Sequence, residues 1–585
     1  MVFRILPVVL VCCAAGLVRA DDSADQKFTK LLDRIWEWNM ENYPEWATSQ
    51  GKRTGLDRWT DDSEEAIHAR EAQREKFLEE LKTIDAAALS PSKRLDHRLL
   101  VRDYERDVEG QRFPGEYLAL NQLGGAHEGI TQLMEVVPAE RPEDFEAILK
   151  RLNAVPVVIE QNIALLQKGL ETGVTPPQAT LGKVAEQIEA LTVDDSLENP
   201  ILAPFRKDTP LLSVEEKKAF QDRGVKALRE SVLPALKKFH AFAKDTYVPG
   251  ARQTLGMSAM PDGEAWYVFS AAGSTTTNLT PKEIHEIGLK EVARIEAEMQ
   301  VLKDKTGFKG SLGEFGKFLR EDPQFFYAKT EDLLAGYRDI CKRADAELPR
   351  LFGKLPRMTY GVKPVPDFAA LSKPTAYYEG GSIEAARPGY FVANTSKLDS
   401  RPKWEMTALA LHEAVPGHHL QIALAQEMDE KHELLRERFY TAYIEGWGLY
   451  AESLGTEMGM YKDPYADFGR LTYEMWRAVR LVVDTGMHSL GWSREQAIDY
   501  FRAHTAKGDH DIAVEVDRYL VWPGQALAYK IGQLKILELR KRAEKELGKK
   551  FSIRAFHDAV LADGAVPLDV LDERITAWIA AEKAK

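Results

Sequence analysis

The chain has 585 residues, too many for one ordinary compact core and enough for two or three lobes. Its composition, 44% hydrophobic and 29% charged, is that of a folded globular protein and excludes a disordered or fibrous one. The formal net charge is −13, and no basic patch is interleaved with aromatic residues, which argues against nucleic acid as a partner.

Residues 1–20 have the pattern of an export signal. Arg4 gives a positive start, Ile5–Leu17 form an apolar core, and the segment 18–20 ends in the small residue Ala20. The apolar run is short for a membrane span. We therefore expect cleavage, no stable membrane span and a periplasmic or secreted mature protein. Two other interpretations remain: an uncleaved anchor, or lipid attachment at Cys12 or Cys13, which the large residues before them disfavour.

Helical patterns dominate the next part of the chain. Apolar residues recur at helical spacing, for example over 145–152. Loop-forming residues between 245 and 280 indicate a boundary. Thr280–Glu283 then has the pattern of a capping box, with proline at the first helical position, and predicts a further long helix. We expect an N-terminal helical lobe over 21–250 and a middle helical segment over 251–400.

Residues 356–400 are the predicted β segment of this middle region. Arg357–Val362 and Gly389–Asn394 have strand composition between Gly and Pro clusters. The chain is again helical over 401–585. The expected fold is mostly α, multi-helical and two-lobed, with a small β-sheet beside a deep cleft.

The stretch His-Glu-Ala-Val-Pro-Gly-His-His-Leu-Gln begins at His412 and carries the strongest chemical signal. His-Glu occurs four times in the chain, but only here do further histidines follow closely. The apolar run 406–411 before it predicts that the pair ends a buried helix. Two imidazoles and a carboxylate in this order are the components of a zinc hydrolase site. The competing interpretation is a helix end with exposed histidines.

The spacing of these histidines is unusual for a zinc site. In an ideal helix His412 and His418 would lie roughly 120° apart, and His412 and His419 about 10 Å apart along the axis. Neither pair could hold one zinc with bonds of about 2.0–2.1 Å. Pro416-Gly417 supplies the required distortion, because proline breaks the helical hydrogen bonding and glycine accepts unusual dihedrals. We favour His418 over His419 as the second ligand.

A second acidic cluster supplies the third ligand. Glu445 lies on a predicted helix over 434–454, and Glu452 follows on the same face. Glu445 is our choice, with Glu452 either orienting a ligand or replacing Glu445. Gly446 and Gly448 weaken this helix and indicate close packing, which we expect to be against the helix that carries His412 (the metal helix). With three protein ligands the zinc keeps an open position for water, and Glu413 is the predicted general base.

Four motifs together resemble a known family. They begin at His412 (H-E-A-V-P-G-H-H-L-Q), Glu445 (E-G-W-G-L-Y-A-E), Arg480 (R-L-V-V-D-T-G-M-H) and Arg518 (R-Y-L-V-W-P-G-Q-A-L-A-Y-K-I-G). In this order they resemble the domain-of-unknown-function 885 family of mostly bacterial, often exported predicted zinc metallopeptidases. That family is distantly similar to helical gluzincins such as thimet oligopeptidase, carboxypeptidase Taq and angiotensin-converting enzyme. The resemblance covers about residues 26–580.

The resemblance implies further site residues. Related gluzincins use a histidine and a tyrosine downstream of the third ligand to stabilise the oxyanion, and His488 and Tyr529 match in order and type. Arg480, Asp484 and His488 share one helix face, which is either part of the site or a structural network. The roles of Arg518, Tyr519 and Lys530 beside the Pro-Gly turn stay open.

The resemblance also gives the β segment a role. In the related peptidases a short strand before the metal helix binds the substrate backbone. Gly389–Asn394 is either that strand or part of a structural hairpin.

Three functions fit these patterns. The first is an exported zinc metallopeptidase that hydrolyses short peptides, with Zn²⁺ as cofactor and peptides as partners. The second is a catalytically silent helical binding protein with structural zinc, in which Glu413 would have no use. The third is a zinc hydrolase of a non-peptide amide or ester. The sequence does not indicate an oligomeric state.

Overall fold

The computed structural model describes residues 23–366, 370, 373–382, 387–436 and 438–585. The predicted export signal, residues 1–20, lies outside the described residues. Within the described part, no helix is both long and apolar enough to cross a membrane. The fold is mostly α with one small sheet, as predicted.

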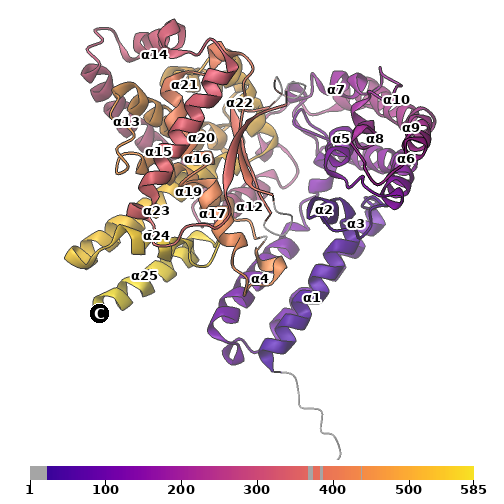
Figure 1. The fold of residues 1–585 in the computed structure, drawn as a ribbon, viewed down its shortest axis with the longest axis horizontal. Helices are drawn as coiled ribbons and strands as arrows, with labels where there is room; N and C mark the ends of the chain where they lie inside the picture. Colours follow the sequence, from indigo (N-terminus) through magenta and orange to yellow (C-terminus); the bar gives the residue numbers. More distant parts are fainter. Residues whose placement is uncertain (1–22, 367–369, 371–372, 383–386, 437) are drawn as a thin grey trace, which may run out of the picture.

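The N-terminal helices gather on one side of the molecule (Figure 1). The longest, α6, buries Phe145, Ile148 and Leu152 on the predicted face and continues through Pro156. Around it lies a core drawn from residues 56–251. The helices are α1 (Ala24–Asn42), α2 (Pro44–Ser49), α3 (Glu64–Thr83), α4 (Pro91–Gly110), α5 (Ala126–Val136), α6 (Pro142–Thr172), α7 (Val184–Ala190), α8 (Ala203–Arg206), α9 (Val214–Ala227), α10 (Leu233–Phe242) and α11 (Val248–Gly250).

The middle region contains four helices before the sheet. The capping box predicted at Thr280 is confirmed: its side chain accepts from the Glu283 backbone, and Glu283 bonds back to the Thr280 backbone. The helix that it opens packs along α20. The helices are α12 (Gly263–Thr275), α13 (Pro281–Lys305), α14 (Leu312–Glu321) and α15 (Thr330–Leu351).

The sheet has three strands in the order β1-β3-β2. β3 (Gly389–Ala393) pairs parallel with β1 (Tyr360–Pro364) and antiparallel with β2 (Ala376–Glu379). Of the two roles considered for residues 389–394, the strand that receives the substrate backbone is ruled out, because both edges of β3 are already paired, and the structural role remains. β2 is an edge strand, and α16 packs against it.

The C-terminal helices carry the four sequence motifs. α16 ends at Glu413 as predicted, and its buried face contacts α15, α19 and α20. The helix predicted over 434–454 is two helices, because the chain leaves helical geometry before Thr441. The helices are α16 (Met406–Glu413), α17 (His418–Gln426), α18 (Glu433–Arg436), α19 (Thr441–Leu454), α20 (Pro464–Ser489), α21 (Arg494–His504), α22 (Asp509–Val521), α23 (Ala528–Leu547), α24 (Ile553–Leu561) and α25 (Leu568–Ala584).

Candidate metal centre

A break between α16 and α17 brings two histidines together. The helix ends at Glu413, and the chain resumes as α17 at His418, with a cis Val415–Pro416 bond between them. A Cβ at Gly417 would lie 1.9 Å from the His412 carbonyl oxygen, so only glycine fits there. The two imidazole rings meet edge to face, with centroids 4.6 Å apart. The distortion expected at Pro416-Gly417 is thus a break between two helices.

The structure places His412, His418 and Glu445 around one point. One ligand atom from each of the three lies within 4.8 Å of the other two. The Nε2 atoms of His412 and His418 are both 3.5 Å from Oε2 of Glu445. Tetrahedral zinc with bonds of about 2.0–2.2 Å holds its ligand atoms about 3.2–3.6 Å apart. The two nitrogen–oxygen distances therefore match those expected between ligands of one zinc ion.

The His412 ring is fixed from two other directions. Its Nδ1 donates to Oε1 of Glu452 at 2.8 Å, and Glu452 is 1% exposed. This is the orienting role considered for Glu452, and it leaves Nε2 for a metal. A Cβ at Gly448 would come within 2.7 Å of the same ring. Gly448 thus packs against the metal helix as expected, whereas Gly446 packs against Gly532 of α23.

Electrostatics favour an ion pair at this point when no cation is bound. Burial lowers the pKa of His412, but hydrogen bonding to Glu445 and Glu452 outweighs it and raises the pKa to about 9. Burial raises the pKa of Glu445, but hydrogen bonds from His412 and His418 bring it well below its usual range. Glu445 is therefore a carboxylate ready to accept a cation, and a metal would replace the proton on His412.

Glu413 and His419 flank the ligands in sequence and differ in their surroundings. Glu413, the last residue of α16, is 9% exposed, and its charge favours protonated His412. His419 turns away from the three ligands: its Nδ1 lies 3.0 Å from the Tyr378 hydroxyl and its Nε2 3.1 Å from the Met358 carbonyl oxygen. Both nitrogens of His419 are engaged with the sheet region, which leaves His418 beside Glu445.

Tyr529, the predicted oxyanion donor, sits near the start of α23. Its ring is 8% exposed and lies under two guanidinium groups, with Arg480 at 4.6 Å and Arg477 at 5.8 Å from the ring centroid. Among the residues that the structure describes, its hydroxyl has no hydrogen-bond partner. The hydroxyl is therefore available to a ligand.

The assignment of His488 to the site is wrong. The side chain is fully buried, Nδ1 accepts from the Met257 backbone N–H at 3.0 Å, and Nε2 donates to the Tyr519 carbonyl oxygen at 2.9 Å. Burial lowers the pKa of His488 to about 4, so the ring is neutral. With both nitrogens bound to the backbone, His488 has no donor left for a substrate.

The other members of the predicted helix face are also engaged. Asp484 accepts from the Tyr267 hydroxyl and from the Gly524 backbone N–H at 3.1 Å. Arg480 donates to the Tyr519 hydroxyl at 2.9 Å and to Glu515 at 3.1 Å. Asp484 and His488 are therefore structural, whereas Arg480 keeps a buried Nη1 without a hydrogen-bond partner among the described residues.

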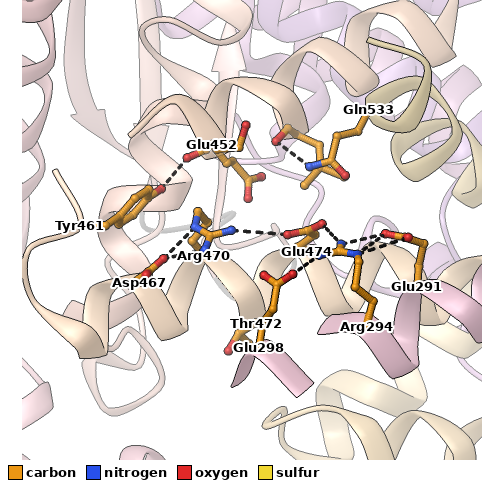
Figure 2. A network of polar contacts seen from close by, with 12 residues as sticks. Glu291, Arg294, Glu298, Glu452, Tyr461, Asp467, Arg470, Thr472, Glu474 and Gln533 are labelled. Atoms are coloured by element: carbon orange, nitrogen blue, oxygen red, sulfur yellow. Dashed lines mark hydrogen bonds and ion pairs between the residues drawn. The ribbon is translucent and has the colours of Figure 1, made fainter. Parts of the chain in front are cut away.

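A network of polar contacts that includes Glu291, Glu474 and Gln533 lies next to α19, the helix that carries Glu445 (Figure 2). Lys530 is fully buried and pairs with Glu474 at 2.7 Å and Glu291 at 2.9 Å. It also donates to Gln533, whose side-chain amide reaches the Leu449 carbonyl oxygen in α19. Lys530 therefore ties α13, α20 and α23 to α19 and does not belong to the metal site.

Sequence reasoning missed two residues beside the site. Arg477 lies with Nη2 3.6 Å from Oε1 of Glu452, the carboxylate that holds His412. Trp447 donates from its indole to the Pro416 carbonyl oxygen at 2.8 Å and thereby anchors the helix break to α19. The spacing of Arg477 from Arg480 would have placed both on one helix face. No sequence signal pointed to Trp447 as an anchor.

Solved structures share this fold. That of a predicted lipoprotein from Colwellia psychrerythraea has a TM-score of 0.91 and 29% sequence identity, covering 96% of this chain and 100% of that one. That of a predicted lipoprotein of unknown function from Shewanella oneidensis has a TM-score of 0.75 and 17% identity, covering 95% and 100%. At the lower identity the likeness is one of fold alone.

Two sequence comparisons test the family named from the motifs. No curated protein matches the chain. A family model described as "Bacterial protein of unknown function (DUF885)" matches residues 44–575, which is most of the chain. The chain belongs to the DUF885 family.

Proposed function

We propose that this protein is a zinc-dependent metallopeptidase. The observation that carries the proposal is the convergence of His412, His418 and Glu445, whose ligand atoms lie within 4.8 Å of one another. The hydrogen bond from Nδ1 of His412 to Glu452 adds support, because metal-binding imidazoles are typically oriented by such a bond. A zinc ion held by three protein groups would supply an activated water and polarise the scissile carbonyl.

Glu413 and Tyr529 provide the groups that hydrolysis needs around such a site. Glu413 follows a ligand directly, and a carboxylate there can take a proton from the attacking water and deliver it to the leaving amine. A structural zinc site would have no use for it. The free hydroxyl of Tyr529 can donate to the oxygen on which charge develops, at no cost in net charge.

The sheet offers support for an extended substrate. β2 is an edge strand packed against α16, the helix that carries His412 and Glu413. A peptide chain added to the edge of β2 would run beside this helix. The proposal thus moves the substrate strand from β3, whose edges are both paired, to β2.

Export is part of the proposal. The pattern of residues 1–20 predicts a signal, and the Colwellia and Shewanella structures are of proteins described as predicted lipoproteins. The mass of the mature N-terminus from cells would distinguish the options. Cleavage near residue 20 supports a free exported protein, and a lipid on Cys12 or Cys13 supports a membrane-anchored one.

Incubation of the zinc-loaded protein with a mixed peptide library tests the proposal. We expect new termini detectable by mass spectrometry, their loss with a chelator and their return with added zinc. A protein that binds zinc and cleaves no peptide would point to the silent binding protein or to an amide or ester hydrolase. A panel of non-peptide amides and esters would then separate these two.

A further inference from the structure

One face of α20 carries aromatic and cationic side chains, and one of them, Arg477, reaches Glu452 beside the candidate metal ligands. Tyr473, Trp476, Arg477 and Arg480 follow one another at helical spacing and are on one side of the helix. The guanidinium of Arg477 is 4.7 Å from the Tyr473 ring centroid, and that of Arg480 is 5.2 Å from the Trp476 centroid. Both guanidinium groups also lie over the ring of Tyr529.

Two donors in this cluster are buried without a partner. Arg477 and Arg480 are 6% and 4% exposed, yet Nε of Arg477 and Nη1 of Arg480 have no hydrogen bond within the described structure. Leaving a buried N–H unpaired is unfavourable, so such groups normally meet a ligand or an ordered water. The Tyr529 hydroxyl, also without a partner among the described residues, adds a third donor nearby.

The local charges favour an anion. Glu515 is shared by Arg480 at 3.1 Å and Arg518 at 3.5 Å, and Glu452 is shared by Arg477 and His412. Lys507 is matched by Glu405 at 2.9 Å. Positive side chains therefore outnumber negative ones in this cluster: Arg477, Arg480, Lys507 and Arg518 against Glu405, Glu452 and Glu515.

We propose that Arg480, assisted by Arg477, binds a carboxylate of the substrate. The proposal rests on the proposed peptidase function and adds a substrate class to it. A guanidinium matches a carboxylate in shape and charge. Arg477 is linked to the metal ligands through Glu452 and His412, and Arg480 lies one helical turn further along α20. The carboxylate is either the C-terminus of the peptide or an acidic side chain close to the cleaved bond.

Three peptides of one sequence test the proposal: a free C-terminal acid, its amide, and an amide with glutamate near the cleaved bond. The zinc-loaded protein should cleave the carboxylate-bearing peptide with a kcat/KM about tenfold to a hundredfold above that of the plain amide, as expected for hydrogen bonds to a charged group. Preference for the first peptide identifies the C-terminus, and preference for the third identifies a side chain. Equal cleavage of all three overturns the subsite and leaves the peptidase proposal intact.

Variants of Arg480 test whether this residue causes the preference for carboxylate-bearing peptides. In Arg480→Met the preference for the carboxylate-bearing peptide over the plain amide should fall below about threefold with zinc content unchanged, and Arg480→Lys should restore part of it. The matched control is Arg494→Met, since Arg494 is paired with both oxygens of Asp517 at 2.6 and 2.9 Å. A preference that survives in Arg480→Met overturns the assignment.

A binding measurement separates the two proposals. Calorimetry with zinc-loaded Glu413→Gln needs no turnover, and it should give tighter binding of the acid than of the amide. That result stands even if the wild type cleaves no peptide, in which case only the peptidase proposal fails. Equal affinities would overturn the subsite without any arginine variant, so the test does not depend on the folding of Arg480→Met.

Discussion

At the scale of single residues, three histidines within eight positions of the chain, His412, His418 and His419, differ in role because their surroundings differ. His412 has one nitrogen bound to Glu452 and the other toward Glu445. His418 has Nε2 toward Glu445, and its Nδ1 is buried without a partner among the described residues. His419 has both nitrogens engaged elsewhere. The same residue type thus has two different environments within a few positions of the chain.

Separate alanine variants of His418 and His419 should behave differently. His418→Ala removes a proposed ligand, so zinc content measured by elemental analysis should fall from about one per chain to near zero. His419→Ala should keep zinc but lower the free energy of unfolding by about 1–3 kcal/mol, because it leaves the buried Met358 carbonyl without its partner. Zinc loss in His419→Ala with retention in His418→Ala would reverse the assignment.

Tyr529→Phe isolates the proposed oxyanion donor. Because no described residue bonds to the Tyr529 hydroxyl, the variant should keep its stability and its zinc. Its turnover rate should fall roughly tenfold to a thousandfold with little change in KM, as for loss of one such donor. Steady-state kinetics beside a thermal melt would check this. An unchanged turnover rate would make Tyr529 a packing residue.

At the scale of elements, α19 must pass close to two other helices. Gly448 faces the His412 ring of α16, and Gly446 faces Gly532 of α23. A side chain at either position would clash with these neighbours, so either α19 or the neighbouring group would have to move. The glycines that weaken the helix therefore permit the approach that forms the site.

Gly448→Ala tests this close approach. The added Cβ would come within 2.7–3.0 Å of His412 ring atoms, so the ring must move. We expect zinc affinity to fall about tenfold to a hundredfold, the usual effect of disturbing the support of a ligand. Gly129→Ala in α5, where nothing lies within 4 Å of a new Cβ, is the control and should keep its affinity. Equal affinities in both variants would show that Gly448 does not set the ring position.

The turn before α23 depends on a buried carboxyl group. Asp484 holds the backbone N–H of Gly524, whose φ of +81° suits glycine. Burial raises the pKa of Asp484 to about 7, against the lowering effect of Tyr267, Gly524 and Arg480. A raised carboxyl pKa means that the native state binds more protons than the unfolded state, so Asp484 makes stability fall as pH rises from about 4 to 7.

Asp484→Asn should remove this contribution, because an amide keeps the acceptor oxygen and does not ionise. Urea unfolding at pH 5 and pH 8 should show a smaller pH-dependent loss of stability in the variant than in the wild type. Identical pH dependence in the two proteins would mean that Asp484 does not titrate in this range.

At the scale of the whole molecule, the sequence predicted what depends on local pattern. The helix ending at Glu413, the capping box at Thr280 and the mostly helical class follow from apolar spacing and cap residues. The grouping of His412, His418 and Glu445 was also predictable, since two of them flank one helix break and the third follows on a helix. These features depend mainly on residues that are close to one another in the sequence.

The failures concern partners that are distant in sequence. β3 became the central strand because the four-residue β2 pairs with its second edge, and strand composition does not reveal such pairing. His488 forms hydrogen bonds with the backbone of Met257, 231 residues away, and of Tyr519. These contacts bury the side chain that was expected to face a substrate. Spacing identifies which residues share a face but not what covers that face.

The most direct test of the central claim is peptide hydrolysis by the zinc-loaded wild type and Glu413→Gln. The substitution keeps the shape of the side chain and removes its ability to accept a proton. We expect both proteins to bind about one zinc per chain, and the variant to lose at least about a hundredfold in turnover. Near-normal hydrolysis by Glu413→Gln, or no hydrolysis by a fully zinc-loaded wild type, would contradict the proposed function.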